Sequence, residues 1–275
     1  MKCTVWQPEA LSKVVSTLGL TEKADYAADH GYEDNVQCYE GPGAPNVAWC
    51  SGLLLPGERS PQKEEGTLSA LAVFCGPLTD VPHLVCSAGV SNDGIDLYID
   101  FRPRADAAYD PQFESLDDYP EPTDRNMFAQ TSARKDFASA FYTEDAVEAR
   151  AALLALGTPT EEPLTAEAAA AISAGPLLVD MRLPLTDENA AAASDACAAA
   201  VDRWLGWMTG AAEMGRELPA GAKQTATYTR DTKVRANHFG FLLGRYTKLY
   251  GVEEGKALAT ADAGPLDEAY VGGGS

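Results

Sequence analysis

The sequence lacks the short motifs that mark the commonest enzyme and metal sites. It has no G-x-G-x-x-G turn, no Walker phosphate loop, no G-x-S-x-G elbow and no H-E-x-x-H helix. These absences weigh against the common nucleotide, hydrolase and zinc chemistries. Any chemistry of this chain is therefore not marked by a standard motif.

Cysteine and histidine are few and scattered. The 275 residues include three histidines and six cysteines, namely Cys3, Cys38, Cys50, Cys75, Cys86 and Cys197. No C-x-x-C pair occurs, and no spacing is typical of metal ligands. We therefore expect no metal site, and a reducing compartment is the simplest inference from the isolated cysteines.

The chain also has no long apolar run and few basic residues. No stretch approaches the roughly 18 consecutive apolar residues of a membrane helix, and the N-terminus lacks the basic-then-apolar pattern of a secretion signal. We expect no membrane insertion and a cytosolic or already trimmed chain. Because 41 acidic residues outnumber 21 basic ones, the formal charge of −20 argues against nucleic acid and anionic membranes as partners.

Residues 222–256 depart from this acidic average. They carry seven basic and three acidic side chains, a local charge of +4, while the rest of the chain carries −24. The basic residues are Lys223, Arg230, Lys233, Arg235, Arg245, Lys248 and Lys256. This segment is the main candidate for binding an anionic ligand, although an ordinary solvated helix face has the same pattern.

A helix over this segment would place a carboxylate on its inward face. At about 100° per residue, one stripe contains Asp231, Val234, His238, Leu242, Tyr246 and Leu249. Two interpretations fit Asp231. It forms an ordinary i,i+4 ion pair with Arg235, or it lies in a pocket where desolvation raises its pKa and makes it a proton donor.

The arrangement of apolar residues predicts one α/β domain. Strands are predicted at 46–55, 67–76, 82–90 and 94–102, with a fifth within 176–184, and 31–45 is expected to be a polar loop. Helices are predicted at 8–18, 144–156, 164–174 and 187–214, the last packing Trp204 and Trp207 on the sheet. We expect a three-layer α/β/α sandwich with a central antiparallel sheet over residues 1–270, followed by a flexible tail at 271–275.

The strand predicted at 94–102 alternates apolar and polar residues. Its polar face carries Asp96, Tyr98, Asp100 and Arg102. This face fits plain exposure to solvent or a ligand pocket. An aromatic and basic cluster within 123–143 would either close over a flat ligand or form a buried aromatic knot.

Three stretches carry a family resemblance. Residues 82–89 and 96–106 form a strand pair ending in an aspartate, a proline and an Arg-x-Asp turn, and residues 176–208 contain a strand and a helix with Trp-Leu-x-Trp. The most specific stretch is the Arg-Asp-x-x-x-Arg helix within 230–251. Together they resemble the red chlorophyll catabolite reductases, within the wider ferredoxin-dependent bilin reductase superfamily.

The resemblance implies an antiparallel sheet between helices and an enzyme that reduces CH–CH groups of a linear tetrapyrrole in a plastid. Such enzymes bind no metal or flavin; reduced ferredoxin delivers single electrons, and side-chain acids protonate the radicals. Asp231 would be the proton donor beside Arg235, and Arg102, Arg104 or Arg235 would clamp the propionates. Acidic ferredoxin would dock on the basic surface at 223–248.

The chain departs from this family on two strands. Related enzymes place an acid over the pigment where this sequence has Cys86 and Ser87, and the histidine often found on the preceding strand is missing from 67–76. His83 is either a substitute donor or a structural histidine. The predicted site thus comprises catalytic Asp231 and His83, with substrate-binding Cys86, Ser87, Asp100, Arg102, Arg104, Arg235 and His238. A phycobilin-forming reductase of biliverdin and a non-catalytic bilin carrier are the alternatives.

Overall fold

An eight-stranded sheet forms the centre of the protein, in the order β1-β2-β3-β4-β5-β6-β8-β7. The structure is a computed structural model and describes residues 6–24, 36–41, 46–56, 67–76, 78–91, 94–104, 140–159, 174–217 and 225–264. Every neighbouring pair of strands is antiparallel, which confirms the predicted α/β fold with a central antiparallel sheet. Among the described helices, none is long and apolar enough to cross a membrane.

The long central strands are those that the sequence predicts. β3 (Val47–Pro56), β4 (Thr67–Cys75), β5 (His83–Ser91) and β6 (Gly94–Arg102) pair in succession, and β8 (Val179–Leu183) pairs with β6. Because neighbours run antiparallel, the end of β4, the start of β5 and the end of β6 meet at one edge of the sheet. This edge carries part of the candidate site.

Three short strands at the borders of the sheet are not predicted by the sequence. They are β1 (Thr21–Glu22), β2 (Val36–Glu40) and β7 (Thr158–Pro159). Part of the segment expected to be a polar loop is therefore strand, and in β2 only Val36 and Cys38 are fully buried. The helix predicted at 164–174, the tail and most of the aromatic cluster at 123–143 lie outside the described residues.

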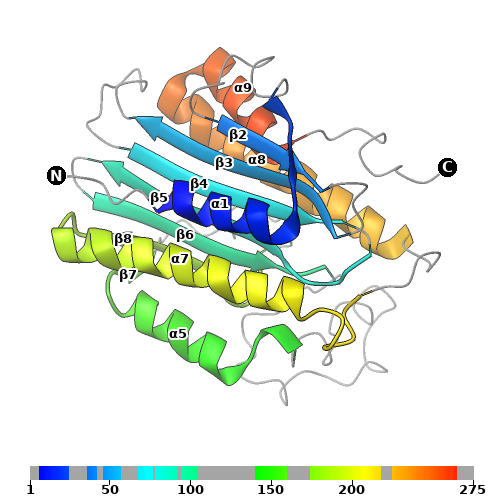
Figure 1. Cartoon of the computed structure of the whole chain (residues 1–275). Helices are drawn as coiled ribbons and strands as arrows, with labels where there is room; N and C mark the ends of the chain where they lie inside the picture. Colours follow the sequence, from blue (N-terminus) through cyan, green and yellow to red (C-terminus); the bar gives the residue numbers. More distant parts are fainter. Residues whose placement is uncertain are drawn as a thin grey trace, which may run out of the picture.

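One face of the sheet is covered by α1 (Gln7–Leu18) and α7 (Asp187–Thr209), with α5 (Glu144–Leu154) beside them against β8 (Figure 1). The Trp204 indole donates a hydrogen bond to the Pro82 carbonyl at 2.8 Å, and Trp207 packs edge-on against Phe101. Both tryptophans belong to the hydrophobic core on this face. The predicted packing of α7 is confirmed, although the helix ends at Thr209 rather than at the expected Met214.

The opposite face is covered by α8 (Thr225–Tyr250) and α9 (Val252–Ala263), which lie behind the sheet in Figure 1. The predicted inward stripe of α8 is buried at Val234, His238, Leu242 and Tyr246. On β6, Tyr98, Asp100 and Arg102 are also buried, each at most 3 % exposed. The interpretation that this polar face is exposed to solvent is therefore wrong for these three residues. Polar groups lie between the sheet and α8.

A tight turn joins α8 to α9. Gly251, between the two helices, has φ +91°. Gly255 lies so close to α8 that an added Cβ would stand 2.4 Å from the Thr247 backbone nitrogen. Because the obstacle is backbone rather than a movable side chain, only glycine fits at position 255. This close contact fixes α9 against α8.

Replacing Gly255 with valine is expected to destabilise the protein by about 1–3 kcal/mol, the usual effect of overpacking a tight contact. Urea unfolding followed by circular dichroism measures the change. A matched control is Gly206→Ala in α7, where an added Cβ meets nothing within 4 Å and the gain in helix propensity should stabilise by about 0.5–1 kcal/mol. Wild-type stability of Gly255→Val would contradict the close helix contact.

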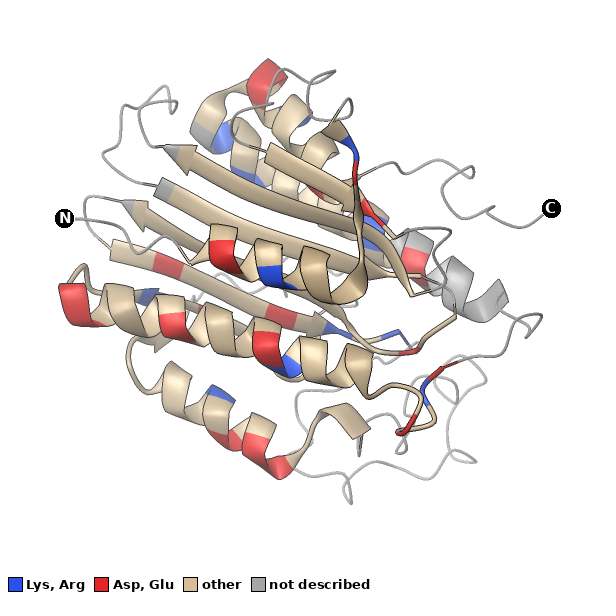
Figure 2. Cartoon of the chain, viewed as in Figure 1, with Lys and Arg blue, Asp and Glu red and all other residues tan. Residues whose placement is uncertain are grey.

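Charged side chains are unevenly placed. Figure 2 shows acidic residues along α1, α5 and α7. Of the seven basic residues in segment 222–256, Lys248 and Lys256 are exposed, but Arg235 is buried and Arg245 is half-buried. The side chains of Lys223, Arg230 and Lys233 lie outside the described part of the chain. At least two basic residues of this segment therefore point toward the sheet.

Candidate functional site

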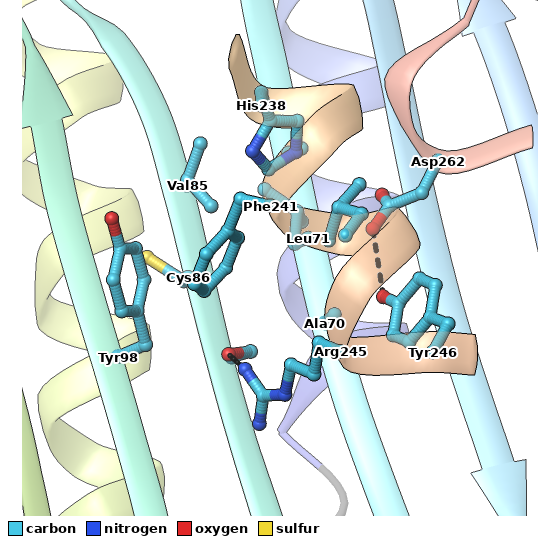
Figure 3. Close-up of a pocket in the computed structure, with 13 residues that line it drawn as sticks. Ala70, Leu71, Val85, Cys86, Tyr98, His238, Phe241, Arg245, Tyr246 and Asp262 are labelled. Atoms are coloured by element: carbon cyan, nitrogen blue, oxygen red, sulfur yellow. Dashed lines mark hydrogen bonds between the residues drawn. The ribbon is translucent and has the colours of Figure 1, made fainter. Parts of the chain in front are cut away.

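Buried polar side chains gather between the sheet and α8. They are His83, Ser87, Asp100, Arg102, Arg104, Arg235, His238 and Asp262, each at most 6 % exposed. Figure 3 shows a cavity that His238 and Asp262 line. Because burying a polar group is costly unless it is hydrogen-bonded, the partners of each group indicate which are already satisfied and which are open to a ligand.

Asp231, in α8, binds Arg104, which follows β6. The Arg104 Nε and Nη2 atoms lie 2.8 Å and 2.6 Å from the two carboxylate oxygens, a bidentate ion pair. The same guanidinium donates to the Gly76 carbonyl at 2.8 Å. Arg235 instead donates to the Ala263 carbonyl at 2.7 Å. The interpretation that Asp231 forms a local ion pair with Arg235 is therefore wrong. Its partner is Arg104, which lies 127 residues away in the sequence.

His83, the first residue of β5, also binds Asp231. Its Nε2 lies 3.1 Å from Asp231 Oδ1, and its Nδ1 accepts the Cys75 backbone N–H at 2.9 Å. Because Nδ1 is an acceptor, we place the ring proton on Nε2, which donates to Asp231. Burial lowers the pKa of His83 to about 4, although Asp231 opposes the shift. His83 is therefore neutral near neutral pH, which fits a residue that positions Asp231.

The pKa of Asp231 is shifted away from that of a proton donor. Burial raises the pKa, but the charge of Arg104 and the hydrogen bonds from Arg104 and His83 together lower it below its ordinary value of 3.8. The expectation of a raised pKa is therefore wrong. In this arrangement Asp231 is an ionised carboxylate whose main effect is to neutralise Arg104.

A second network lies along β6 with Asp100 at its centre. Asp100 accepts hydrogen bonds from Arg102 Nε at 3.0 Å, the Tyr98 hydroxyl at 3.2 Å and the Gly175 amide at 2.8 Å. Burial raises the pKa of Asp100 despite these donors. Arg102 is engaged within the protein, but its Nη1 is buried without a hydrogen-bond partner in the described part of the chain. One donor of Arg102 is thus open to a ligand.

His238 lies about two turns along α8 from Asp231. Its ring is 1 % exposed and packs 5.3 Å from the Phe74 ring. Neither ring nitrogen has a hydrogen-bond partner among the described residues. Burial, together with the charges of Arg102 and Arg235, lowers the pKa of His238 well below 6.5, so the ring is neutral. An unmet buried donor or acceptor costs about 1–3 kcal/mol, which a ligand at this position would recover.

A small cavity separates α8 from the sheet beside His238 (Figure 3). The sheet contributes Ala70, Leu71, Ala72, Val85, Cys86, Ser87 and Tyr98, and the helices contribute His238, Phe241, Leu242, Arg245, Tyr246 and Asp262. Its volume is about 10 Å³, close to the space that one water molecule needs. Arg245 Nη1 lies 3.4 Å from Ser87 Oγ across this space. Arg245, which is not among the predicted site residues, is thus the arginine that lines the cavity.

Cys86 and Ser87 turn to opposite faces of β5. Ser87 faces α8 and contacts Arg245. Cys86 borders the cavity, but its side chain lies in the core on the α7 face, as the alternation of a strand requires. A role for the Cys86 thiol in ligand binding therefore has no support from its orientation. Among the described residues, no group of three or more His, Cys, Asp or Glu could hold a metal ion.

Asp262 forms a third network that the sequence does not indicate. It accepts the Tyr246 hydroxyl at 2.9 Å and the Ser51 hydroxyl at 2.7 Å. Burial raises the pKa of Asp262 above its ordinary value of 3.8. Tyr246 lies on the predicted inward stripe of α8, which is the one local signal. Ser51 and Asp262 are 211 residues apart, and no local sequence pattern marks either of them as a site residue.

The fold is similar to that of a solved protein. No protein-family model and no curated protein sequence matches the chain. Among solved structures, the chain is similar to selenomethionine phytochromobilin synthase from tomato in complex with biliverdin, with a TM-score of 0.56 and 14 % sequence identity. The match covers 93 % of this chain and 80 % of that one. At this identity the similarity concerns the fold.

Proposed function

We propose that this protein is a ferredoxin-dependent reductase of a linear tetrapyrrole. The observation that carries the proposal is His238, a buried histidine beside a cavity whose two ring nitrogens have no hydrogen-bond partner among the described residues. It lies on the helix where the sequence resemblance to bilin reductases is most specific. The similar fold of a protein solved with biliverdin supports the same ligand class. For the complete chain we propose the three-layer α/β/α sandwich of that superfamily, supported by helices on both faces of the sheet.

The groups around the cavity match the chemistry of a linear tetrapyrrole. Such a pigment has pyrrole N–H groups, terminal oxygen atoms and at least one propionate. Of the residues that line the cavity, His238 offers one donor and one acceptor, and Arg245 offers a positive charge for a propionate. Arg102 does not line the cavity, but its Nη1 is a further buried donor without a partner among the described residues. Tyr98 and Phe241, whose rings lie 5.6 Å apart, provide flat apolar surface. Arg104 and Arg235 are already bound within the protein and are less suited to clamp a propionate.

The cavity of about 10 Å³ is far smaller than a tetrapyrrole, since ligand sites of drug-sized molecules are about 300–1,000 Å³. The pigment therefore enters only when α8 moves away from β4–β6.

Electrons would arrive singly from reduced ferredoxin, without a bound cofactor, and this donor favours a plastid location. Ferredoxin is acidic and the chain carries −20, so docking needs a locally basic surface. Lys248 and Lys256 are exposed on α8 and α9. We propose that ferredoxin docks there, next to the cavity wall.

Red chlorophyll catabolite is the substrate that the sequence resemblance favours, and biliverdin is the alternative that the fold similarity favours. A different candidate is a carrier that binds a bilin without reducing it. Two observations favour the carrier: the family's acid is replaced at Cys86 and Ser87, and the pKa of Asp231 lies below its ordinary value.

Anaerobic titration with each pigment, followed by reduced ferredoxin, tests the proposal. We expect the absorption spectrum of one pigment to change on binding and to bleach when ferredoxin is added. His238→Leu removes the hydrogen-bonding ring and should weaken binding about tenfold, the effect of losing roughly 1–1.5 kcal/mol. Lys248→Glu should slow ferredoxin-driven turnover and leave binding unchanged.

Lys13→Glu, on α1 at the other face, is the control for Lys248→Glu and should behave as wild type. Binding without bleaching would establish the carrier instead. If neither pigment changes its spectrum, the tetrapyrrole proposal fails.

A further inference from the structure

We propose that Asp262 is the acid that holds a proton beside the cavity and donates it to the bound pigment. This inference rests on the proposed function and assigns a proton source outside the motifs that carry the family resemblance. It follows from the position of the carboxyl, from the kind of hydrogen-bond partners it has, and from a comparison with the other buried carboxylates of the site.

The position of Asp262 is fixed at the last turn of α9. Gly264, directly after the helix, has φ +73° and lies against the Trp49 ring, where an added Cβ would stand 2.6 Å away. Asp262 is 2 % exposed and lines the cavity, together with Tyr246 and Arg245 (Figure 3). Its carboxyl therefore faces the space that a pigment would occupy rather than solvent.

The partners of Asp262 accommodate both protonation states. Ser51 Oγ lies 2.7 Å from Asp262 Oδ1 and 3.0 Å from the Asp262 carbonyl oxygen. With an ionised carboxylate, the hydroxyl donates to Oδ1. With a protonated carboxyl, Oδ1–H donates to Ser51 and the hydroxyl turns to the backbone carbonyl. A rotation of one hydroxyl therefore lets Asp262 gain or lose a proton without moving heavy atoms.

Within the described part of the chain, Asp231 and Asp100 have no such partner. Asp231 is bound by the guanidinium of Arg104 and by an imidazole whose other nitrogen is occupied, so all its neighbours donate. Asp100 is bound by a guanidinium, a hydroxyl that itself accepts from Arg102, and a backbone amide. Neither residue lines the cavity. Burial raises the pKa of Asp262, in the direction that a proton donor requires.

Reduction of one carbon–carbon double bond takes two electrons and two protons. Two reduced ferredoxins, which are one-electron iron–sulfur proteins, supply the electrons and are oxidised. After the first electron, the O–H bond of Asp262 breaks and a C–H bond forms on the pigment radical anion. The carboxylate left behind accepts from Tyr246 and Ser51. Water reprotonates it, and the second electron and proton complete the reduction.

The first test uses infrared spectroscopy of the pigment-free protein over a series of pH values. Burial raises the pKa of both Asp262 and Asp100, so two protonated-carboxyl bands should persist above the ordinary aspartate pKa of 3.8. The band of Asp262 should disappear in Asp262→Asn, while it should remain in Asp100→Asn and in Asp231→Asn. Tyr246→Phe removes a donor to the ionised form, so the band should persist to higher pH. Identical bands in wild type and Asp262→Asn would overturn the proposal.

The second test is turnover with reduced ferredoxin. Asp262→Asn should bind the pigment with the wild-type spectral change but reduce it about 10²–10⁴-fold more slowly, the usual contribution of a general acid. Asp96→Asn, an exposed carboxylate paired with Arg182, should turn over as wild type. Wild-type turnover of Asp262→Asn would overturn the donor role. If the wild type reduces no pigment, the proposed function and the donor role fail together, while the infrared band separately decides whether Asp262 holds the proton.

Discussion

Replacing Arg104 with methionine is expected to destabilise the protein by about 3–5 kcal/mol, the usual cost of removing one partner of a buried ion pair. Arg104 is 2 % exposed and makes both hydrogen bonds of a bidentate pair with Asp231. Its loss leaves the Asp231 carboxylate without a cation and the Gly76 carbonyl without this donor. Urea unfolding at neutral pH measures the change in the free energy of unfolding.

Two further variants test whether the stability lost in Arg104→Met comes from the buried ion pair. Arg182→Ala breaks a pair with Asp96 whose side chains are 43 % and 48 % exposed, so it should cost at most about 1 kcal/mol. The double variant Arg104→Met with Asp231→Leu removes both charges and should recover much of the lost stability. If Arg104→Met costs no more than Arg182→Ala, the buried pair does not stabilise the fold.

His83 should make the stability of the wild type depend on pH. In the unfolded chain a histidine takes up a proton as the pH falls below about 6.5, but in the folded protein His83 stays neutral until about pH 4. The unfolded state therefore binds more protons between these values, and acid favours unfolding. This contribution is fully present above pH 6.5 and is lost as the pH falls to about 4, a change of about 3 kcal/mol at 1.36 kcal/mol per pH unit.

His83→Gln isolates this effect, because the glutamine amide can still donate to Asp231 but does not titrate. The excess stability of wild type over His83→Gln should be largest near neutral pH and shrink as the pH falls from 6.5 to 4. Comparing the two proteins cancels the opposite contributions of Asp100 and Asp262, whose raised pKa values favour folding in acid. Parallel stability curves for the two proteins would show that folding does not shift the pKa of His83 and would contradict this prediction.

The central sheet was predictable because its strands carry a local signal. Each of the four long strands is a short run of aliphatic and aromatic residues between turn residues, and their order along the chain is also their order in the sheet. The same pattern does not predict β2, because only Val36 and Cys38 are fully buried in it. Its place in the sheet depends on pairing with β3, and a local pattern does not contain that information.

The site was predicted in part for the same reason. Periodicity along α8 correctly turns Asp231 and His238 toward the sheet. It does not identify Arg104 as the partner of Asp231, because the two are brought together only when the end of β6 meets α8. The predicted pKa direction of Asp231 was wrong for this reason: desolvation was considered without the nearby guanidinium. Asp262 lies in an alanine-rich helix without any motif. It is recognised as a site residue only from its contacts with Ser51 and Tyr246 in the structure.

The small size of the cavity also determines how stability and affinity are related in this protein. Between α8 and the sheet there is room for about one water molecule. Under the proposed function, a tetrapyrrole would therefore bind only the fraction of the population in which α8 has moved away from the sheet. The apparent dissociation constant is then the intrinsic constant divided by that fraction. A substitution that tightens the packing of α8 would thus make the protein more resistant to heat and, at the same time, a weaker binder of the proposed pigment.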